Sequence, residues 1–309
     1  MIRPIRPTDL VALAYFNRKA NPNEARTRAN LQRKHGGPLP LRDFLEQWLS
    51  LEENRHSWIY VENRRVMGLI SVRNKASSSL WDIDRLFLAA EAEGEICTQL
   101  LNYLTAVGGE MGIHRVFLRL AEDSHLLEHA RQAGFFQYQY ESLFRWNGHT
   151  RLSADVEVGL KTKGRRDDHG IFQLYNSSVP AMVRQAQAMT FQEWRELRDK
   201  NQDTRDRQEF ILQENGVIAG WLQILTNHRV GQFDLLVRPG SEQAIEGMAS
   251  FALSRLTKKS AVYALIPEYQ AQACRVLEEN GFIPVGKFCS MVKQLTVRVR
   301  QPRLVPVRA

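Results

Sequence analysis

Apolar and polar positions alternate along two separate stretches of this chain, and the two stretches follow one plan. Residues 57–61 and 66–72 alternate with a period of two, and residues 208–213 and 217–225 do so again. This period is typical of half-buried β-strands. A short polar turn joins each pair of strands, and the second turn contains Asn215-Gly216, a strong hairpin signal. Each stretch therefore predicts an antiparallel hairpin.

Both hairpins are followed by the same order of strand, long helix, strand, short helix and strand. In the first half the pattern predicts these elements at 80–88, 94–111, 114–120, 124–133 and 135–146, and in the second half at 233–237, 241–256, 261–266, 268–279 and 282–299. A short strand and two helices are expected before each hairpin. In the first half the strand is predicted at 2–6 and the helices at 10–18 and 41–51. In the second half the strand is predicted at 156–160, one helix is capped at 167–168, and the next is opened by the capping box at 190–193.

The two halves keep their landmarks in step. Gly68 and Gly220 lie about 150 residues apart, as do Gly134 and Gly281, which both precede phenylalanine at the end of a helix. This period exceeds the ~20–50 residues of solenoid repeats and suits a whole domain. We therefore predict a mixed α/β chain of two tandem domains, each with a mixed, mostly antiparallel sheet flanked by helices and one right-handed parallel crossover. The expected limits are residues 1–146 and 155–298, with a linker at 147–154 and a basic tail at 299–309.

Composition indicates a water-soluble chain that carries no obvious metal site. Its 309 residues are 43% hydrophobic, enough for two cores, yet no apolar run approaches the ~18 residues of a membrane span. The first residues do not resemble a signal peptide. Cys97, Cys274 and Cys289 lack metal-ligand spacing, which indicates reduced thiols in a cytoplasmic protein. No serine-nucleophile elbow and no Cys-x-x-Cys pair is present.

The net charge of +8 is concentrated in two segments, residues 18–34 and the tail after residue 298. Scattered basic residues usually form a solvated face, whereas a clustered basic loop can bind a phosphorylated ligand or RNA. No zinc-finger, helix-turn-helix or RNA-binding aromatic motif accompanies the cluster. Nucleic acid is therefore the less favoured partner.

Several of these features resemble the GNAT superfamily of acyl-CoA-dependent N-acyltransferases in its tandem, two-domain form. The resemblance rests on Ile2-Arg-Pro followed by Thr8-Asp9-Leu10, on the hairpin glycines, on Val237-Arg-Pro239 at a strand end, and on the two helices that end in Gly-Phe. It implies a splayed pair of parallel strands that holds the pantetheine arm of the acyl donor, with the pyrophosphate on the next helix N-terminus. Acetyl-CoA is the implied donor, no metal is implied, and the acceptor would be a small-molecule or peptide amine.

The residues expected at the donor site follow from the same resemblance. They are Gly94 in the first half, beside acidic residues that the family pattern lacks, and Val237, Pro239 and Gly240 in the second. The tyrosine that often serves as general acid is replaced in both halves, by Ala130 and Leu277; Tyr263 and Tyr269 are weaker alternatives.

Asp84 and Asp234 are the candidate general bases, because the sequence places them at matching positions on the strand that borders each cleft. A carboxylate on an apolar strand needs a partner or solvent, so an ion pair of Asp84 with Arg85 or Arg119 is the structural alternative. The leading hypothesis is an N-acyltransferase with the second half as the better candidate site. The alternative is a catalytically inactive GNAT-fold protein that acts as a binding module.

Overall fold

A computed structural model describes residues 1–28, 31, 55–75, 79–90, 93–148, 159–188, 190–199, 206–226 and 229–296. The expected helix at 41–51, the basic tail and most of the linker lie outside these residues. The described elements confirm the mixed α/β class. In the described residues, no helix is long and apolar enough to cross a membrane.

The elements of the first half follow the sequence pattern closely. They are β1 (Ile2–Pro4), α1 (Leu10–Lys19), β2 (Arg55–Glu62), β3 (Arg65–Lys75), β4 (Leu80–Leu88), α3 (Glu93–Glu110), β5 (Arg115–Ala121), α4 (Leu126–Gln132) and β6 (Phe136–Trp146). The turn between β2 and β3 has two residues with left-handed backbone, Asn63 at φ 48° and Arg64 at φ 63°. Such a turn matches the twist of paired strands, which is why the hairpin forms here.

The second half repeats this order and adds one helix that the sequence did not predict, α6. Its elements are β7 (Leu160–Thr162), α5 (Asp168–Ser178), α6 (Ala181–Gln187), α7 (Phe191–Asp199), β8 (Asp206–Glu214), β9 (Val217–Thr226), β10 (Val230–Val237), α8 (Ala244–Leu256), β11 (Ala261–Pro267), α9 (Ala271–Glu279) and β12 (Phe282–Gln294). The predicted capping box opens α7: the Glu193 N–H donates to Thr190 Oγ1 at 3.2 Å, and the Thr190 N–H donates to Glu193 Oε2 at 3.1 Å.

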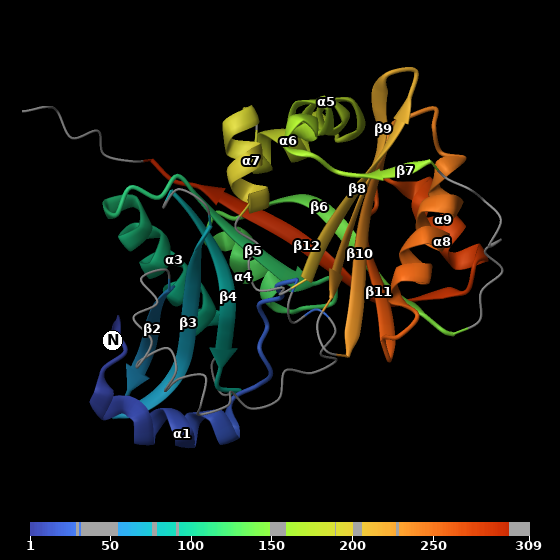
Figure 1. Cartoon of the computed structure of the whole chain (residues 1–309). Coiled ribbons are helices and arrows are strands. Elements are labelled where there is room, and N and C mark those ends of the chain that lie inside the picture. Colours follow the sequence, from blue (N-terminus) through green and yellow to red (C-terminus); the bar gives the residue numbers. More distant parts are fainter. Residues whose placement is uncertain are drawn as a thin grey trace, which may run out of the picture.

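All the strands that the structure describes form one sheet, in which the two halves exchange their last strands (Figure 1). The order of the 12 strands is β1-β2-β3-β4-β5-β12-β6-β11-β10-β9-β8-β7. β12, from the second half, lies between β5 and β6, while β6, from the first half, lies between β12 and β11. Each half therefore completes its sheet with a strand that the other half supplies.

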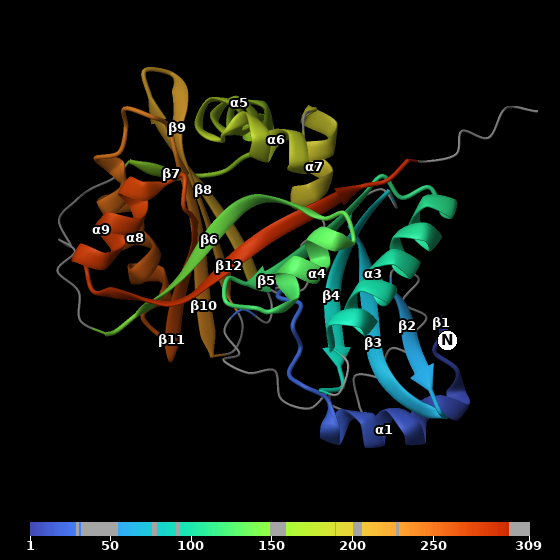
Figure 2. The same cartoon turned by 180° about the vertical axis from the view of Figure 1, so that it is seen from behind.

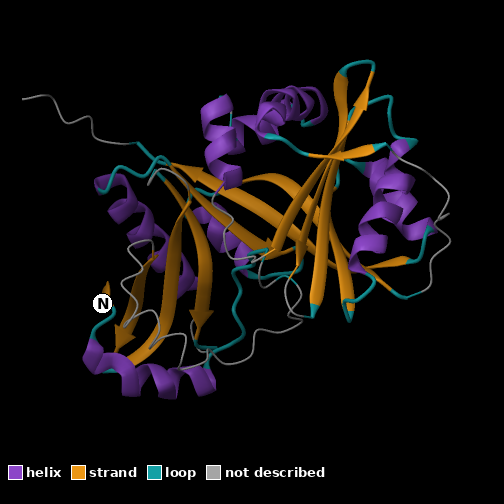
Figure 3. Ribbon diagram, in the orientation of Figure 1, coloured by secondary structure: helices purple, strands orange, loops and turns teal. Residues whose placement is uncertain are grey.

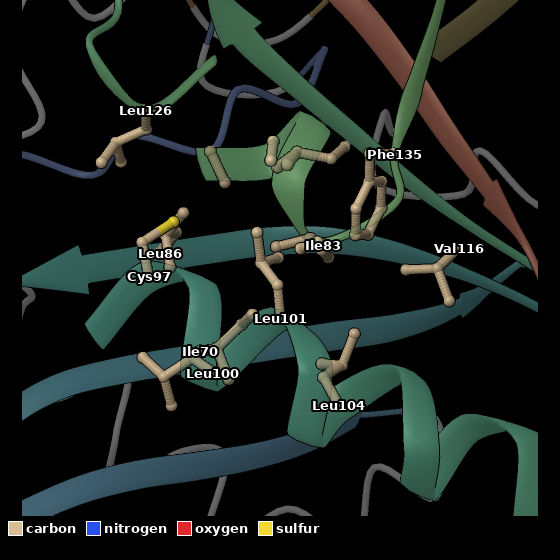
Figure 4. Packing of buried hydrophobic residues seen from close by; sticks show 14 of the residues in the cluster. Ile70, Ile83, Leu86, Cys97, Leu100, Leu101, Leu104, Val116, Leu126 and Phe135 are labelled. Atoms are coloured by element: carbon tan, nitrogen blue, oxygen red, sulfur yellow. The ribbon is translucent and has the colours of Figure 1, made fainter. Parts of the chain in front are cut away.

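Helices cover both faces of this sheet (Figures 2 and 3). α3 and α4 cover the core of the first half, where Ile70, Leu86, Cys97 and Leu100 interdigitate (Figure 4). In the second half, α8 and α9 pack on one face, and α5, α6 and α7 on the other. β10 separates these two layers: Leu235 belongs to the α8 side and Leu236 to the α5 side.

Each half contains a parallel strand pair that comes apart along its length. β4 pairs with β5 only from Leu80 to Asp82, although β4 continues to Leu88. β10 pairs with β11 only from Val230 to Phe233, although β10 continues to Val237. Two clefts between parallel strands follow from this geometry, one in each half.

Candidate active site

The cleft of the first half is filled by the protein's own chain. Residues 21–26, which follow α1, lie between β4 and β5 and are hydrogen-bonded to both strands. The N–H of Asn21 donates to Leu88 O at 3.0 Å, that of Glu24 to Leu86 O at 3.0 Å, and that of Arg26 to Arg119 O at 2.8 Å. We call residues 21–26 the cleft segment. It satisfies the backbone groups that the separation of the two strands would otherwise leave unpaired.

Asn23 holds the cleft segment in place through its side chain. Its Nδ2 donates to Asp84 O at 3.0 Å, and its Oδ1 accepts from Leu86 N at 2.8 Å and from Ala25 N at 3.2 Å. Ala25 is fully buried within the core of the first half. A pantetheine arm therefore cannot enter this cleft while the cleft segment occupies it.

The start of α3 is also covered. A Cβ atom on Gly94 would lie 2.2 Å from Nε2 of His129, a side chain of α4. The imidazole thus packs directly against the backbone where the resemblance places a pyrophosphate. The role of Gly94 in donor binding stays a prediction, and the fit of the surrounding residues to that role is poor.

The cleft of the second half opens into a cavity. In the described part of the chain, no backbone segment is hydrogen-bonded between β10 and β11 beyond their paired residues; the Gln270 side chain donates to Leu235 O at 3.1 Å. The adjoining cavity has a volume of about 240 Å³. It is lined by Asp234 and Leu236 of β10, by Pro267 and Tyr269 at the end of β11, and by residues of β5, β6, β9 and α5 to α7.

The loop before α8 leaves open space beside Gly240. Gly240 has a φ of +94°, and a Cβ built on it would meet no atom within 4 Å. Its N–H donates to the carboxylate of Glu242, at 3.0 and 2.9 Å to the two oxygens. Val237 is buried at the end of β10, and Pro239 follows it at the entry to this loop. The predicted donor residues of the second half thus lie together, and the carboxylate of Glu242 accepts from the exposed N–H of Gly240.

Asp234 is a buried carboxylate on the wall of the cavity. One of its oxygens pairs with Arg28, and the other, Oδ1, has no hydrogen-bond partner among the described residues. Burial raises the pKa of Asp234 above its ordinary value of 3.8, while the charge of Arg28 opposes this shift. A buried carboxylate of raised pKa with a free oxygen is suited to accept a proton.

Asp84 does not occupy the equivalent position, and here the sequence alignment of the two halves was wrong. Gly68 pairs with Leu88, and Gly220 pairs with Val237. Counting back three residues from each partner leads to Arg85 in the first half and to Asp234 in the second. A bulge in β4 supplies the extra residue, and such a bulge shifts every following side chain by one place.

Asp84 is a buried ion-pair partner in the first half. It contacts Arg55 of β2 at 2.7 Å and Arg73 of β3 at 3.0 Å, so an ion pair is indeed present but with partners that the sequence did not suggest. Burial raises the pKa of Asp84, and the arginines oppose the shift. Its backbone carbonyl accepts from Asn23 of the cleft segment.

The cavity also contains a buried ion pair that the sequence did not reveal. Glu141 of β6 is buried and accepts from Arg119 Nε of β5 at 2.7 Å and from Ser290 Oγ of β12 at 2.6 Å. Burial acts to raise the pKa of Glu141, but the charges of Arg119 and Arg28 and the hydroxyl hydrogen bond outweigh it and hold the pKa below 4.5. The three strands meet only through the strand exchange, which a sequence pattern does not show.

Three tyrosines line the cavity: Tyr138, Tyr175 and Tyr269. Burial raises the pKa of Tyr138 to about 12 and raises the pKa values of Tyr175 and Tyr269 further. All three are therefore protonated at neutral pH. Tyr269, which the sequence offered as a weaker alternative, lies beside the cleft, while Tyr263 packs in a cluster with Leu143 and Leu265. Ala130 and Leu277 are both fully buried in the cores.

The thiols and the acidic side chains suggest no second chemistry. Cys97 and Cys289 are buried and Cys274 is half-buried, all three unoxidised. Within the described ranges, no cluster of histidine, cysteine, aspartate and glutamate has the arrangement of a metal site.

The comparisons with known proteins agree with this architecture. No protein-family model and no curated protein matches the sequence. A GCN5-related N-acetyltransferase from Sphaerobacter thermophilus superposes with a TM-score of 0.58 at 13% identity, over 95% of both chains. A tandem GNAT protein from the clavulanic acid biosynthesis pathway superposes with a TM-score of 0.53 at 12% identity, over 95% of this chain and 98% of that one. The chain therefore has the fold of tandem GNAT proteins, as predicted.

Proposed function

We propose that this protein transfers an acyl group from acyl-CoA to an amine, and that the transfer takes place in the second half. One observation supports this most directly: the cleft of the first half is filled by the cleft segment, whereas the cleft between β10 and β11 leads into a cavity that contains a buried carboxylate. The fold adds to this, since two structural neighbours carry the name acetyltransferase or GNAT. For the first half alone, the filled cleft favours the alternative role of an inactive partner domain.

The residues of the second half can perform each part of such a transfer. Asp234 accepts the proton of the attacking amine through its free Oδ1. The Leu235 carbonyl faces the cleft, because it accepts from Gln270, and the N–H of the same residue points the same way and can polarise the thioester carbonyl. Tyr269, neutral at pH 7, can return a proton to the departing thiolate. Acetyl-CoA is the donor that the resemblance implies.

Titration of acetyl-CoA into the full-length chain by calorimetry tests the proposal. We expect one site per chain, because only one of the two clefts between parallel strands is accessible among the residues that the structure describes. Absence of binding at millimolar acetyl-CoA, by protein with a cooperative unfolding transition, would contradict the proposal and leave the inactive binding module as the better interpretation.

Glu242→Gln is expected to strengthen acetyl-CoA binding by about two- to fivefold. The carboxylate of Glu242 accepts from the Gly240 N–H, on the amide that the resemblance assigns to the pyrophosphate, and its charge repels an incoming anion. Calorimetry at low ionic strength measures the change. Glu95→Gln, at the start of α3 in the first half, is the matched control and should leave the affinity unchanged, since that helix start is covered by His129. Equal effects of both variants would argue against a donor site at α8.

Tyr269→Phe is expected to lower kcat about 100-fold while leaving KM for the donor nearly unchanged. The substitution keeps the ring that lines the cavity and removes only the hydroxyl proton. Steady-state kinetics with a saturating amine gives both parameters. Tyr263→Phe, a tyrosine outside the cavity lining, serves as the control. If Tyr269→Phe retained full kcat, the leaving thiolate would have to take its proton from solvent.

A further inference from the structure

One pair of opposite charges on the wall of the cavity has a partly exposed guanidinium. Arg28 and Asp234 contact each other across the cavity wall, with exposed side-chain fractions of 35% and 7%. The more exposed guanidinium can swing away from the buried carboxylate, whose Oδ1 already lacks a partner among the described residues. The pair therefore offers a cation and an anion, side by side, to a ligand that carries both charges.

The other charged residues of the cavity are already neutralised by each other. Glu141 accepts from Arg119 and from Ser290 within the protein. A ligand that replaced these contacts would have to separate a buried ion pair, which is strongly unfavourable. Recognition of a charged ligand thus rests on Arg28 and Asp234.

Arg28 reaches this position because the cleft of the first half is filled. It follows the cleft segment by two residues, and that segment is anchored by the Arg26 N–H to Arg119 O and by the buried Ala25. A segment that occupies the donor cleft of one half thus delivers a guanidinium into the cavity of the other. The cleft segment therefore both fills the first cleft and positions Arg28 at the cavity.

Aromatic side chains form part of the walls of the cavity. Six rings line it: those of Phe117, Tyr138, Tyr175, Trp194, Trp221 and Tyr269. Aromatic rings pack favourably against another ring, in offset-stacked or edge-to-face geometry, at centroid distances of about 4.5–7 Å. The volume of about 240 Å³ is below the range of ~300–1,000 Å³ that is typical of sites for drug-sized ligands, so the ligand is a small metabolite.

We propose that the amine acceptor is a free α-amino acid with an aromatic side chain. This inference rests on the proposed function and specifies its substrate class. The carboxylate of the amino acid binds Arg28, its amino group binds Asp234, and its ring packs against the aromatic walls. In the transfer, the amino nitrogen forms a bond to the acyl carbon and the carbon–sulfur bond of acyl-CoA breaks. The ammonium group of the amino acid loses two protons: one leaves to solvent, and Asp234 takes the other from the attacking nitrogen. The thiolate receives a proton from Tyr269, which regains one from Asp234 through solvent, so the products are the N-acyl amino acid, free CoA and one proton.

Calorimetry with the full-length protein tests this assignment without an acyl donor. The probes are L-phenylalanine, phenethylamine, which lacks the carboxylate, 3-phenylpropionate, which lacks the amine, and L-alanine, which lacks the ring. We expect L-phenylalanine to bind at least about tenfold more tightly than each of the others. Loss of the carboxylate or of the amino group removes a charged contact with Arg28 or Asp234, and loss of the ring removes the packing against the aromatic side chains. Comparable binding of phenethylamine or of L-alanine would overturn the assignment.

Variants of Arg28 test whether its guanidinium binds the carboxylate of the ligand, provided that the variants remain folded. Arg28→Met should abolish the preference for L-phenylalanine over phenethylamine, and Arg28→Lys should retain part of it. Arg18→Met, an exposed basic residue on α1 in the same stretch of sequence, is the matched control and should behave like the wild type. If Arg28→Met kept the preference while remaining folded by circular dichroism, the assignment of the carboxylate site would be wrong.

Binding of the donor, acetyl-CoA, is measured in a separate titration. Binding of L-phenylalanine without binding of acetyl-CoA would support the amino-acid site and contradict the transferase. Binding of acetyl-CoA without binding of L-phenylalanine would overturn the acceptor class and leave the transferase intact.

Discussion

Asp234→Asn lowers kcat/KM for acyl transfer by about 10²- to 10⁴-fold if Asp234 is the general base, the range that is typical for loss of such a group. The asparagine has nearly the same shape and can still contact Arg28, but it cannot accept a proton from the amine. Steady-state rates of CoA release with acetyl-CoA and a saturating amine measure the effect. The affinity for acetyl-CoA alone should change little, because Asp234 lies on the cavity wall rather than in the loop before α8.

The dependence of the rate on pH identifies the same group. Burial raises the pKa of Asp234 above 3.8, so the wild-type rate should rise as the pH increases through this raised pKa and the carboxylate loses its proton. Asp234→Asn should lose this rise, leaving only the ionisation of the substrate amine. A rise that persisted in the variant would assign it to the amine alone.

Asp84→Asn is the matched comparison, because the sequence alone made the two aspartates equal candidates. Asp84 is paired with Arg55 and Arg73 in the half whose cleft is filled, so its substitution should alter stability and leave kcat/KM of the remaining folded protein unchanged. An equal loss of activity in both variants would mean that the first half takes part in the chemistry.

The sequence was sufficient to predict the elements because each is encoded locally. The alternation in β2 and β3, the turn at Asn215-Gly216 and the helix ends at Gly134 and Gly281 all depend on residues a few positions apart. Gly134 and Gly281 have φ values of +83° and +88°, the left-handed conformation that ends a helix and favours glycine. α6 was missed because it has only seven residues, which begin after Pro180. This is about two helical turns, too few for a helical period to be recognised in the sequence.

The exchange of β6 and β12 could not be predicted, because both arrangements of these strands present the same alternating side chains. A strand that carries the correct apolar face fits beside either β5 or β11, and the choice depends on long-range pairing. The division at residues 147–154 therefore marks the repeat in the sequence, whereas in the sheet β12 lies between two strands of the first half, and β6 lies between two strands of the second.

The site was predicted only in part for a similar reason. Asp234 and Gly240 belong to local patterns that the sequence shows, and Tyr269 was a weaker alternative; their roles stay predictions. Arg28 was noticed only as one of a basic cluster, because nothing near it in the sequence shows that the cleft segment carries it into the other half. Glu141 resembled any polar residue on a strand until Arg119 and Ser290 were found beside it.

Glu141→Leu is expected to destabilise the protein by about 3–5 kcal/mol, because it leaves the guanidinium of Arg119 partly buried without its counter-charge. The contacts of Glu141 join β5, β12 and β6. Their loss therefore weakens both the packing of the exchanged strands and the walls of the cavity. Urea unfolding followed by circular dichroism measures the change. Because the folded pKa of Glu141 lies below 4.5, its contribution is present above that pH and disappears as the pH falls through the folded pKa.

The double variant Glu141→Leu with Arg119→Met distinguishes a buried ion pair from a simple loss of packing. Removing both charges leaves no uncompensated ion, so the double variant should be more stable than Glu141→Leu alone, with a coupling energy of about 1–3 kcal/mol. Glu122→Gln, which removes one partner of the half-exposed Lys287 at 2.6 Å, should cost less than about 1 kcal/mol and sets the scale for a surface pair. If the losses of the two single variants simply added, the coupling energy would be zero, and the contact between Glu141 and Arg119 would not explain the loss of stability in Glu141→Leu.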